Sequence, residues 1–171
     1  HASSVAALME TIGSGAVTNV FADVARADVA LLTGSNTTAN HPVAATFIKQ
    51  AAKAGTDLIV VDVRRNAIAD VARHFAQIRP GTDVAFYNAL LHVLCRDGLL
   101  DRDYIATHTE GFDELEDLVT NDYSAEQAST VCGVPAEQIE AISHTIRRAT
   151  PPGGGGTMIV YSGMGISQPV T

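Results

Sequence analysis

The sequence predicts an α/β fold, a Rossmann-like parallel sheet flanked by helices. Two apolar runs, residues 29–32 and 58–61, each end in a polar loop, and a segment with helical spacing begins between them near His41. Parallel strands that are buried on both faces are continuous apolar runs, and the connection between them usually contains a helix. Residues 28–62 therefore have the outline of a βαβ unit, whose ligand normally binds outside the carboxyl ends of the strands.

The bulk composition indicates one globular domain over residues 1–171. Hydrophobic residues make up 46% of the chain and charged residues 18%, which is enough apolar side chain for a single core. The net charge of -8 disfavours a nucleic-acid-binding surface of the usual basic kind. No apolar run approaches the roughly 20 residues that a membrane span requires, and no signal-peptide pattern is present. We therefore expect no nucleic-acid partner and no membrane span.

The two cysteines, Cys95 and Cys132, lie far apart in the sequence and match no zinc-binding spacing. We expect both to be reduced and to pack as small hydrophobic side chains. The lack of a disulfide framework in the sequence is typical of a cytoplasmic protein.

The first half of the chain is expected to hold two short helices before the βαβ unit. Residues 3–9 and 19–27 are predicted as these helices. The crossover helix is expected over residues 42–54, with Pro42 in its first turn and Gly55 directly after its end. Helical spacing predicts that its apolar face consists of Val43, Phe47, Ile48 and Ala51.

Further strands and helices are expected in the second half. Strands are predicted over residues 58–63, 75–78 and 157–161. Helices are predicted over residues 83–96, after a cap at Asp101, and at three places between residues 113 and 149. In a parallel sheet the loops that follow the strands converge on one edge, so the candidates for ligand binding lie in those loops.

The loop after the first strand contains Gly34, Ser35, Asn36 and Thr38, and His41 follows it. A glycine directly after a buried strand lets the backbone approach a ligand, and the start of the next helix offers unpaired N–H groups to a phosphate. The loop matches neither the GxGxxG pattern nor a P-loop. An ordinary βα loop with polar caps is an equally good interpretation, and His41 is as well placed to cap the helix as to contact a ligand.

Charged residues follow the next strand. Asp62 stands where nucleotide-binding sheets place an acid that binds a ribose or a base, and Arg64 and Arg65 beside it can bind phosphate. Asp83, two residues after Gly81, either caps the next helix or reaches the same ligand. Taken singly, each residue is more simply interpreted as a cap or a surface ion pair. Together with the Gly34 loop they favour a nucleotide-like ligand.

The sequence contains no Ser/His/Asp set, no paired-carboxylate site and no metal-ligand spacing. We therefore predict no metal ligand within this chain, and we do not expect it to catalyse a reaction by itself.

Several segments, in the same order and over nearly the whole length, resemble the cofactor-binding portion of the catalytic subunit of molybdopterin-dependent formate dehydrogenases. They are HASSVAALMETIGSGAVTN, ADVALLTGSNTTANHPVAA, LIVVDVRR, IRPGTDVAFYNALLHV, EGFDEL, CGVPAEQI and GMGISQ. The resemblance is strongest to NAD-coupled, cytoplasmic enzymes of the molybdopterin oxidoreductase family. It implies that residues 1–171 are a single cofactor-binding domain cut from a larger subunit.

The resemblance also implies a cofactor, bis(molybdopterin guanine dinucleotide) with molybdenum or tungsten. By motif match, one arm of the cofactor is lined by Gly34, Ser35, Asn36, Thr38 and His41. Its nucleotide end is held by Asp62 and Arg64, with Gly81 and Asp83 adding to the pocket. The residues that lie along the cofactor are Gly163, Met164, Gly165 and Gln168.

His1 matches the family's histidine that follows the metal-ligating Cys or selenocysteine and assists formate oxidation, so we expect the metal ligand just upstream. The family's iron–sulfur cysteines and formate-orienting arginine are not matched and belong to other parts of the subunit. The resemblance thus implies formate as the substrate of the parent enzyme. It also implies iron–sulfur and flavin (FMN) subunits as partners that pass electrons to NAD.

Two other interpretations stay open at this point. One is a different molybdopterin oxidoreductase, such as a nitrate reductase-like enzyme. The other is a non-catalytic nucleotide-binding module with the same sheet edge.

Overall fold

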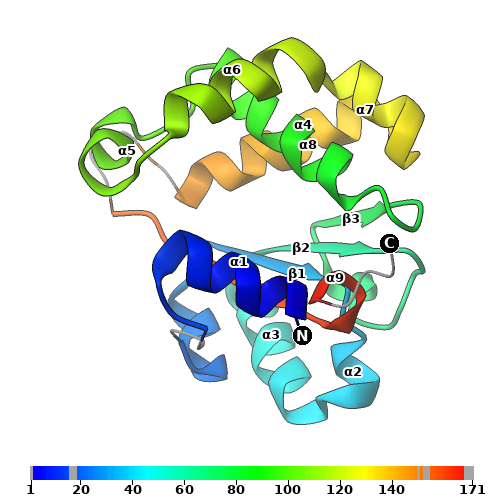
Figure 1. Ribbon diagram of the computed structural model, residues 1–171. Helices are drawn as coiled ribbons and strands as arrows, with labels where there is room; N and C mark the ends of the chain where they lie inside the picture. Colours follow the sequence, from blue (N-terminus) through cyan, green and yellow to red (C-terminus); the bar gives the residue numbers. More distant parts are fainter. Residues whose placement is uncertain (1, 16–18, 150, 152–154, 168–171) are drawn as a thin grey trace.

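The computed structural model describes residues 2–15, 19–149, 151 and 155–167. They form a parallel four-stranded sheet with the order β3-β2-β1-β4, and helices flank both of its faces (Figure 1). The strands are β1 (Val29–Thr33), β2 (Asp57–Asp62), β3 (His74–Gln77) and β4 (Met158–Ser162). The predicted α/β fold with a parallel sheet is thus confirmed.

The central strands are buried because helices cover both faces of the sheet. Every residue of β1 is buried, and so is every residue of β2 before Asp62. In the middle of β1, Leu31 lies opposite Ile59 on one side and Val160 on the other. This arrangement explains why the two strands are continuous apolar runs in the sequence.

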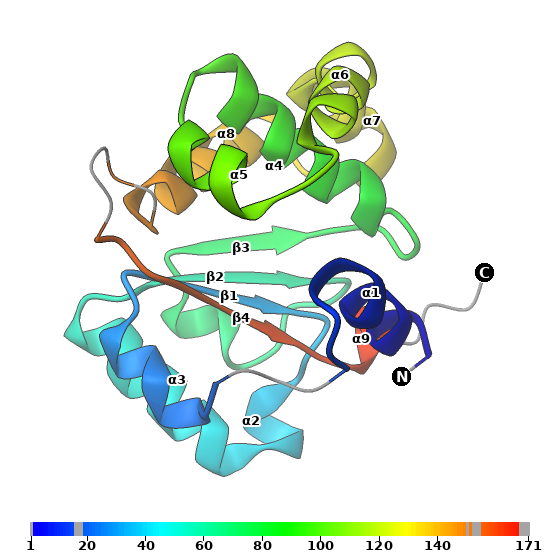
Figure 2. The ribbon, with the colours of Figure 1, turned by 60° about the vertical axis from the view of Figure 1, so that its left-hand side comes forward.

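One face of the sheet is covered by the crossover between β1 and β2 and by short 3-10 helices (Figure 2). The elements are η1 (Phe21–Arg26), α2 (Thr37–Asn40), α3 (Pro42–Ala54) and η2 (Ala69–Val71). The bounds of α3 match the predicted helix, and Gly55 after it adopts a left-handed φ of 116°. The sequence did not predict α2, which is only one turn long.

The structure corrects the predicted apolar face of α3. Val43 is 69% exposed and Phe47 is 38% exposed. The buried residues of the helix are Ala44, Ala45, Ile48 and Ala51. Because three of these four buried residues are alanines, the helix can pack close to the strands, and the larger Val43 and Phe47 turn outward.

A bundle of helices covers the opposite face (Figure 2). Its members are α4 (Asp83–Arg96), α5 (Arg102–His108), α6 (Phe112–Asp122), α7 (Ala125–Cys132), α8 (Ala136–Ile146) and η3 (Arg147–Ala149). The fully buried Phe86 of α4 packs in one core cluster with Ile59 of β2 and Ile142 of α8. The predicted cap is present as well, since the Asp101 carboxylate accepts a hydrogen bond from the Tyr104 amide at 2.9 Å.

Two helices lie at the ends toward which the strands run, α1 (Ala2–Ile12) and α9 (Met164–Ser167) (Figure 1). They contact each other across the end of the sheet. None of the described helices is long and apolar enough to cross a membrane. Cys132 is buried as predicted, whereas Cys95 is only half-buried, and both are free thiols.

At the amino edge of the sheet, a buried carboxylate joins the two helical layers. Asp57 begins β2, and its side chain is only 8% exposed. One carboxylate oxygen accepts from Arg73 at 3.1 Å, and the other accepts from Arg148, which follows α8. The ion pairs therefore tie the helical bundle to the sheet.

Candidate functional site

The loops that follow the strands meet at one edge of the sheet, as the sequence predicted. All three strand pairings are parallel, so Thr33, Asp62 and Ser162 end their strands on the same side. The candidate site therefore lies at the carboxyl edge, and α1 and α9 lie beside it (Figure 2).

The Gly34 loop and the loop from Gly163 to Gly165 interlock through their backbones. The Gly163 amide donates to the Thr33 carbonyl at 2.9 Å, and the Gly165 amide donates to the Gly34 carbonyl at 3.0 Å. Gly34 has a left-handed φ of 58°, and a Cβ there would come within 2.8 Å of the Ile166 nitrogen. A Cβ at Gly163 would come within 2.8 Å of the Ser35 Cα. These glycines are therefore required for the close approach of the two loops.

A cavity of about 450 Å³ opens between these loops, α1 and the start of α3. Its wall includes six of the residues predicted from the sequence to bind a ligand, namely Gly34, Ser35, Asn36, His41, Gly163 and Met164. The rest of its wall is formed by Ser4, Val5, Leu8, Gly15, Phe21, Thr37, Asn40, Ile48, Val160, Tyr161 and Ser162. The predicted loops thus form one concave surface.

His41 and Asn36 reach this cavity without serving as side-chain caps. Asn36 is the N-cap of α2 and His41 is the N-cap of α3, yet neither side chain makes a capping hydrogen bond. The capping role that the sequence left open for His41 is therefore filled by its backbone only.

Two hydroxyl groups of the Gly34 loop lack hydrogen-bond partners. The Oγ1 atoms of Thr37 and Thr38 are buried, and neither has a partner among the described residues. Thr37 is one of the residues that line the cavity, whereas Thr38 is not among the described residues of its wall. Buried hydroxyls are normally paired, so these two are exceptions among the described residues.

Asp62 lies at the same edge but outside the cavity wall, and a residue that the sequence did not select holds it in place. The Asp62 carboxylate accepts from the Arg64 amide at 3.2 Å and from the Asn66 side chain at 3.1 Å. The same Asn66 amide lies 3.5 Å from the Ser35 carbonyl, so Asn66 connects the loops after β1 and β2. No local pattern marks Asn66, because its partners include a residue 31 positions away.

The Arg64 side chain is exposed at this edge and takes part in no ion pair among the residues that the structure describes. Its neighbour Arg65, in contrast, pairs with Asp70 at 3.1 Å and lies over the ring of Phe75. Arg64 is thus available to a ligand, whereas Arg65 has a structural role.

Gly81 and Asp83 lie apart from the cavity wall. Gly81 adopts a left-handed φ of 77° in an exposed turn, and a Cβ there would contact nothing within 4 Å. Asp83 occupies the first turn of α4, where a carboxylate favours the helix dipole. Gly165 packs against Gly34 rather than lining the cavity. His1 and Gln168 lie outside the described residues.

Tyr87 is a second residue that the sequence did not select. Its hydroxyl donates to Thr33 Oγ1 at 2.5 Å, so α4 is bonded to the end of β1 directly before Gly34. Burial raises the pKa of Tyr87 to about 12. A tyrosine at helical spacing resembles any core aromatic in the sequence, so only the structure reveals this contact.

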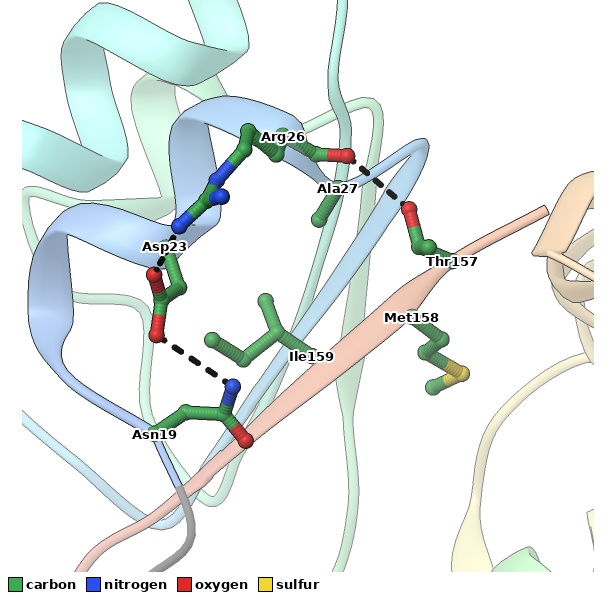
Figure 3. Close-up of a pocket in the computed structure, with 7 residues that line it drawn as sticks. All are labelled: Asn19, Asp23, Arg26, Ala27, Thr157, Met158 and Ile159. Atoms are coloured by element: carbon green, nitrogen blue, oxygen red, sulfur yellow. Dashed lines mark hydrogen bonds and ion pairs between the residues drawn. The ribbon is translucent and has the colours of Figure 1, made fainter. Parts of the chain in front are cut away.

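A second cavity, of about 410 Å³, lies between η1 and the amino end of β4 (Figure 3). Its polar groups bond to one another. The Asp23 carboxylate accepts from the Val20 amide, Arg26 and Asn19, and these bonds hold its pKa below the usual range. The Thr157 hydroxyl donates to the Arg26 carbonyl at 2.9 Å. This cavity is therefore the weaker candidate for a ligand site.

Known relatives match most of the chain. The "F420-dependent formate dehydrogenase subunit alpha" of Methanocaldococcus jannaschii is 40% identical over 139 residues, which is 81% of this chain and 20% of that protein. Formate dehydrogenase H of Escherichia coli is 29% identical over 98% of this chain and 22% of its own length. A nitrate reductase of Symbiobacterium thermophilum is 34% identical over 98% of this chain and 23% of its own length.

The fold is also found among solved structures. Acetylene hydratase from Pelobacter acetylenicus superposes with a TM-score of 0.70 at 24% identity, covering 85% of this chain and 21% of that one. The chain spans about a fifth of the length of the curated relatives it matches. Residues 1–169 match the family described as molybdopterin oxidoreductase, and the chain belongs to that family.

Proposed function

We propose that this chain is the cofactor-binding portion of the catalytic subunit of a formate dehydrogenase, and that it binds bis(molybdopterin guanine dinucleotide) at the carboxyl edge of its sheet. The observation that carries this proposal is the cavity, because six of the residues selected by motif fall on its wall. Membership of the molybdopterin oxidoreductase family and the formate dehydrogenases among its relatives support the proposal.

The residues at this edge fit such a group. The interlocked glycines hold the loops after β1 and β4 against each other, so that residues of both loops form one concave wall. The exposed Arg64 can bind phosphate oxygens without first breaking an ion pair.

The individual assignments follow from these positions. Gly34, Ser35, Asn36 and His41 would contact one arm of the cofactor together with Gly163 and Met164 on the cavity wall. The nucleotide end would be held by Asp62 and Arg64. Further contacts are assigned by motif to Thr38, Gly81, Asp83, Gly165 and Gln168.

The chemistry of the parent enzyme would be the oxidation of formate to CO2, which releases two electrons and a proton. The bound molybdenum or tungsten cofactor would supply the two-electron redox chemistry. His1 is proposed as the group that takes up the proton, since the pKa of an imidazole is about 6.5 and lies near working pH. The other residues of this chain would bind and orient the cofactor.

The partners belong to the same proposal. They are the remainder of the catalytic subunit and iron–sulfur and flavin subunits that pass the electrons to NAD in the cytoplasm. Because the names of some relatives specify F420, an assay of the purified enzyme with NAD and with F420 as alternative acceptors tests this part separately.

Cofactor content of the full-length protein tests the main proposal. Asn36→Ala should lower bound pterin and molybdenum or tungsten roughly fivefold, because it removes a hydrogen-bonding group from the cavity wall without removing a helix cap. Asn121→Ala is the matched control, since the Asn121 side chain donates to the Asp117 carbonyl on the exposed α6. Formate oxidation by a preparation free of both metals would contradict the proposal, as would equal cofactor content in the two variants.

A nitrate reductase is the second candidate. The relative from Symbiobacterium thermophilum favours it, because it matches 98% of this chain at 34% identity. Assays of the same purified protein with formate and with nitrate separate the two reactions, and reduction of nitrate without formate oxidation would replace the first candidate by the second.

A further inference from the structure

The two outermost strands of the sheet, β3 and β4, differ in how their outer sides are covered. They lie at opposite ends of the strand order (Figure 2). On β3, the Gln138 side chain of α8 donates to the Phe75 carbonyl at 2.7 Å, and the His74 ring lies 2.8 Å from the Thr145 hydroxyl. The outer side of β3 is therefore bonded to the helical bundle.

The hydrogen bonds between β4 and β1 determine which backbone groups of β4 face outward. The Thr157 carbonyl accepts from the Val29 amide at 3.2 Å, and the Gly163 amide donates to the Thr33 carbonyl at 2.9 Å. Successive residues of a strand direct their backbone groups to alternate sides, so the odd-numbered residues bond to β1. The residues whose amide and carbonyl groups point outward are Met158, Val160 and Ser162. In the part of the chain that the structure describes, no strand pairs with this outer side.

The side chains of β4 are those of an internal strand. Its sequence, MIVYS, contains no charged residue and no proline, which are the residues that commonly protect an exposed edge from pairing. Val160 is 55% exposed, although it lies in the same row of the sheet as Leu31 and the fully buried Ile59. An apolar edge without such protection is a template for a further strand.

The strand order indicates what kind of strand would pair there. The described order, 3-2-1-4, is the first part of the doubly wound order 3-2-1-4-5-6, in which the fourth strand is internal and a parallel strand lies beside it. This chain spans about a fifth of the length of its curated relatives, so their subunits have much further chain that can supply one. A second copy related by a two-fold axis would instead pair its β4 in the antiparallel direction.

We propose that the outer side of β4 is an interaction surface for an apolar strand from another part of the same subunit, which pairs with it in parallel. This inference rests on the part of the proposed function that assigns the chain to a larger catalytic subunit, and not on the cofactor or the reaction. The added strand covers Val160 and makes β4 an internal strand.

Hydrogen exchange of the full-length catalytic subunit, resolved to single amides, tests the pairing directly. The Tyr161 amide faces β1 and serves as the internal reference. With a strand on the outer side, the Val160 amide should exchange within about tenfold of the Tyr161 rate, because both are then in sheet hydrogen bonds. Exchange of the Val160 amide about a hundredfold faster than that of Tyr161 would overturn the proposal.

Val160→Pro tests the same hydrogen bond by removing it. Proline lacks the outward amide at this position but leaves the neighbouring bonds to β1 in place, so a free edge tolerates it and a paired strand does not. The melting temperature of the full-length subunit should fall by roughly 5 °C or more.

Gln77→Pro is the matched control on the opposite edge. The Ile78 amide donates to the Asp62 carbonyl at 3.2 Å, so the alternation places the Gln77 amide on the outer side of β3. This variant should lower the melting temperature by less than half as much, although it also removes the bond from the Gln77 side chain to the Val63 carbonyl. Equal falls in the two variants would overturn the proposal, because the strain of a proline in a strand would then explain both.

The source of the strand and the proposed function are tested separately. The exchange experiment is made on the isolated catalytic subunit, whose monomeric state is checked by light scattering. Protection of the Val160 amide that appears only in a dimer, or only with other subunits bound, would overturn the assignment to the same subunit. A subunit that protects Val160 but holds no pterin would overturn the proposed function alone. A pterin-loaded subunit with an unprotected Val160 amide would overturn only this inference.

Discussion

At the amino edge of the sheet the Asp57 carboxylate bonds to both Arg73 and Arg148, whereas at the carboxyl edge the hydroxyls of Thr37 and Thr38 are buried without described partners. The two edges lie at opposite ends of the same buried strands. One edge satisfies its polar groups internally and links the helical layers, and the other leaves polar groups unpaired beside a cavity.

This difference shows that the amino edge of the sheet contributes to stability, whereas the carboxyl edge holds the cavity. A buried charge must be paired within the protein, so Asp57 can serve only the fold. A buried hydroxyl without a partner lowers the stability of the protein, so the carboxyl edge carries a cost that the amino edge avoids. The second cavity, near the amino end of β4, follows the pattern of the amino edge, because Asp23 is already bonded to its neighbours (Figure 3).

The largest effect is expected at Asp57. Asp57→Ala should lower the free energy of unfolding by about 3 kcal/mol, because two arginines lose a buried partner. Urea denaturation of the chain measures this loss. Asp70→Ala is the control, since both side chains of the Arg65–Asp70 pair are more than half exposed, and it should cost less than about 1 kcal/mol. Equal losses in the two variants would remove the contrast between the edges.

Gly34→Ala should lower the free energy of unfolding by about 2 kcal/mol, because the new Cβ would strain a left-handed residue and meet the Ile166 nitrogen at 2.8 Å. Gly98→Ala isolates the contact, because Gly98 has a similar φ of 63° and open space around it. Its cost should be about 1 kcal/mol. Thermal unfolding of both variants gives the difference, and its absence would mean that the glycine loops do not interlock as described.

Alkaline pH should destabilise the protein through Tyr87. Burial raises the pKa of Tyr87 to about 12 in the folded chain, whereas an unfolded tyrosine titrates near pH 10. The unfolded chain therefore loses its proton first, so the stability that is present below pH 10 falls by about 2 kcal/mol as the pH approaches 12. Urea denaturation from pH 8 to 11 should reveal the onset of this fall.

Tyr87→Phe is the control for this pH dependence. At neutral pH it should cost about 1 kcal/mol, because the hydrogen bond to Thr33 is lost. Above pH 10 it should lose less stability than the unaltered chain does. A shallow slope should persist, since burial also raises the pKa of Tyr161. Parallel alkaline slopes for the two proteins would contradict the role assigned to Tyr87.

The smallest effect is expected at Asn66. Asn66→Ala should cost about 1 kcal/mol of stability, because the bond to the Asp62 carboxylate and the weaker one to the Ser35 carbonyl are lost. Hydrogen exchange of the Ser35 and Arg64 amides should increase together if Asn66 couples the two loops. Faster exchange at only one of them would show that the loops are independent.

Much of the fold follows from local patterns. The bounds of α3 and α4 match the predicted ranges because Pro42, Gly55 and Asp83 are strong local signals for helix ends. The short α2 was missed because a single turn has no periodicity to detect. The predicted apolar face of α3 included Val43 and Phe47 because they are large and apolar. The residues that are buried instead are the smaller Ala44 and Ala45.

For the candidate site, the sequence determined by itself which residues follow the parallel strands, since strand ends and glycines are local features. Only the tertiary structure decided which of them meet. Gly34 and Gly163 interlock because β1 pairs with β4 across more than a hundred residues, and Asp62 and Asp83 stay outside the cavity that this pairing creates. The unpaired hydroxyl of Thr37 is likewise a property of packing, because a hydroxyl lacks a partner only when the surrounding chain has excluded water and offered no acceptor.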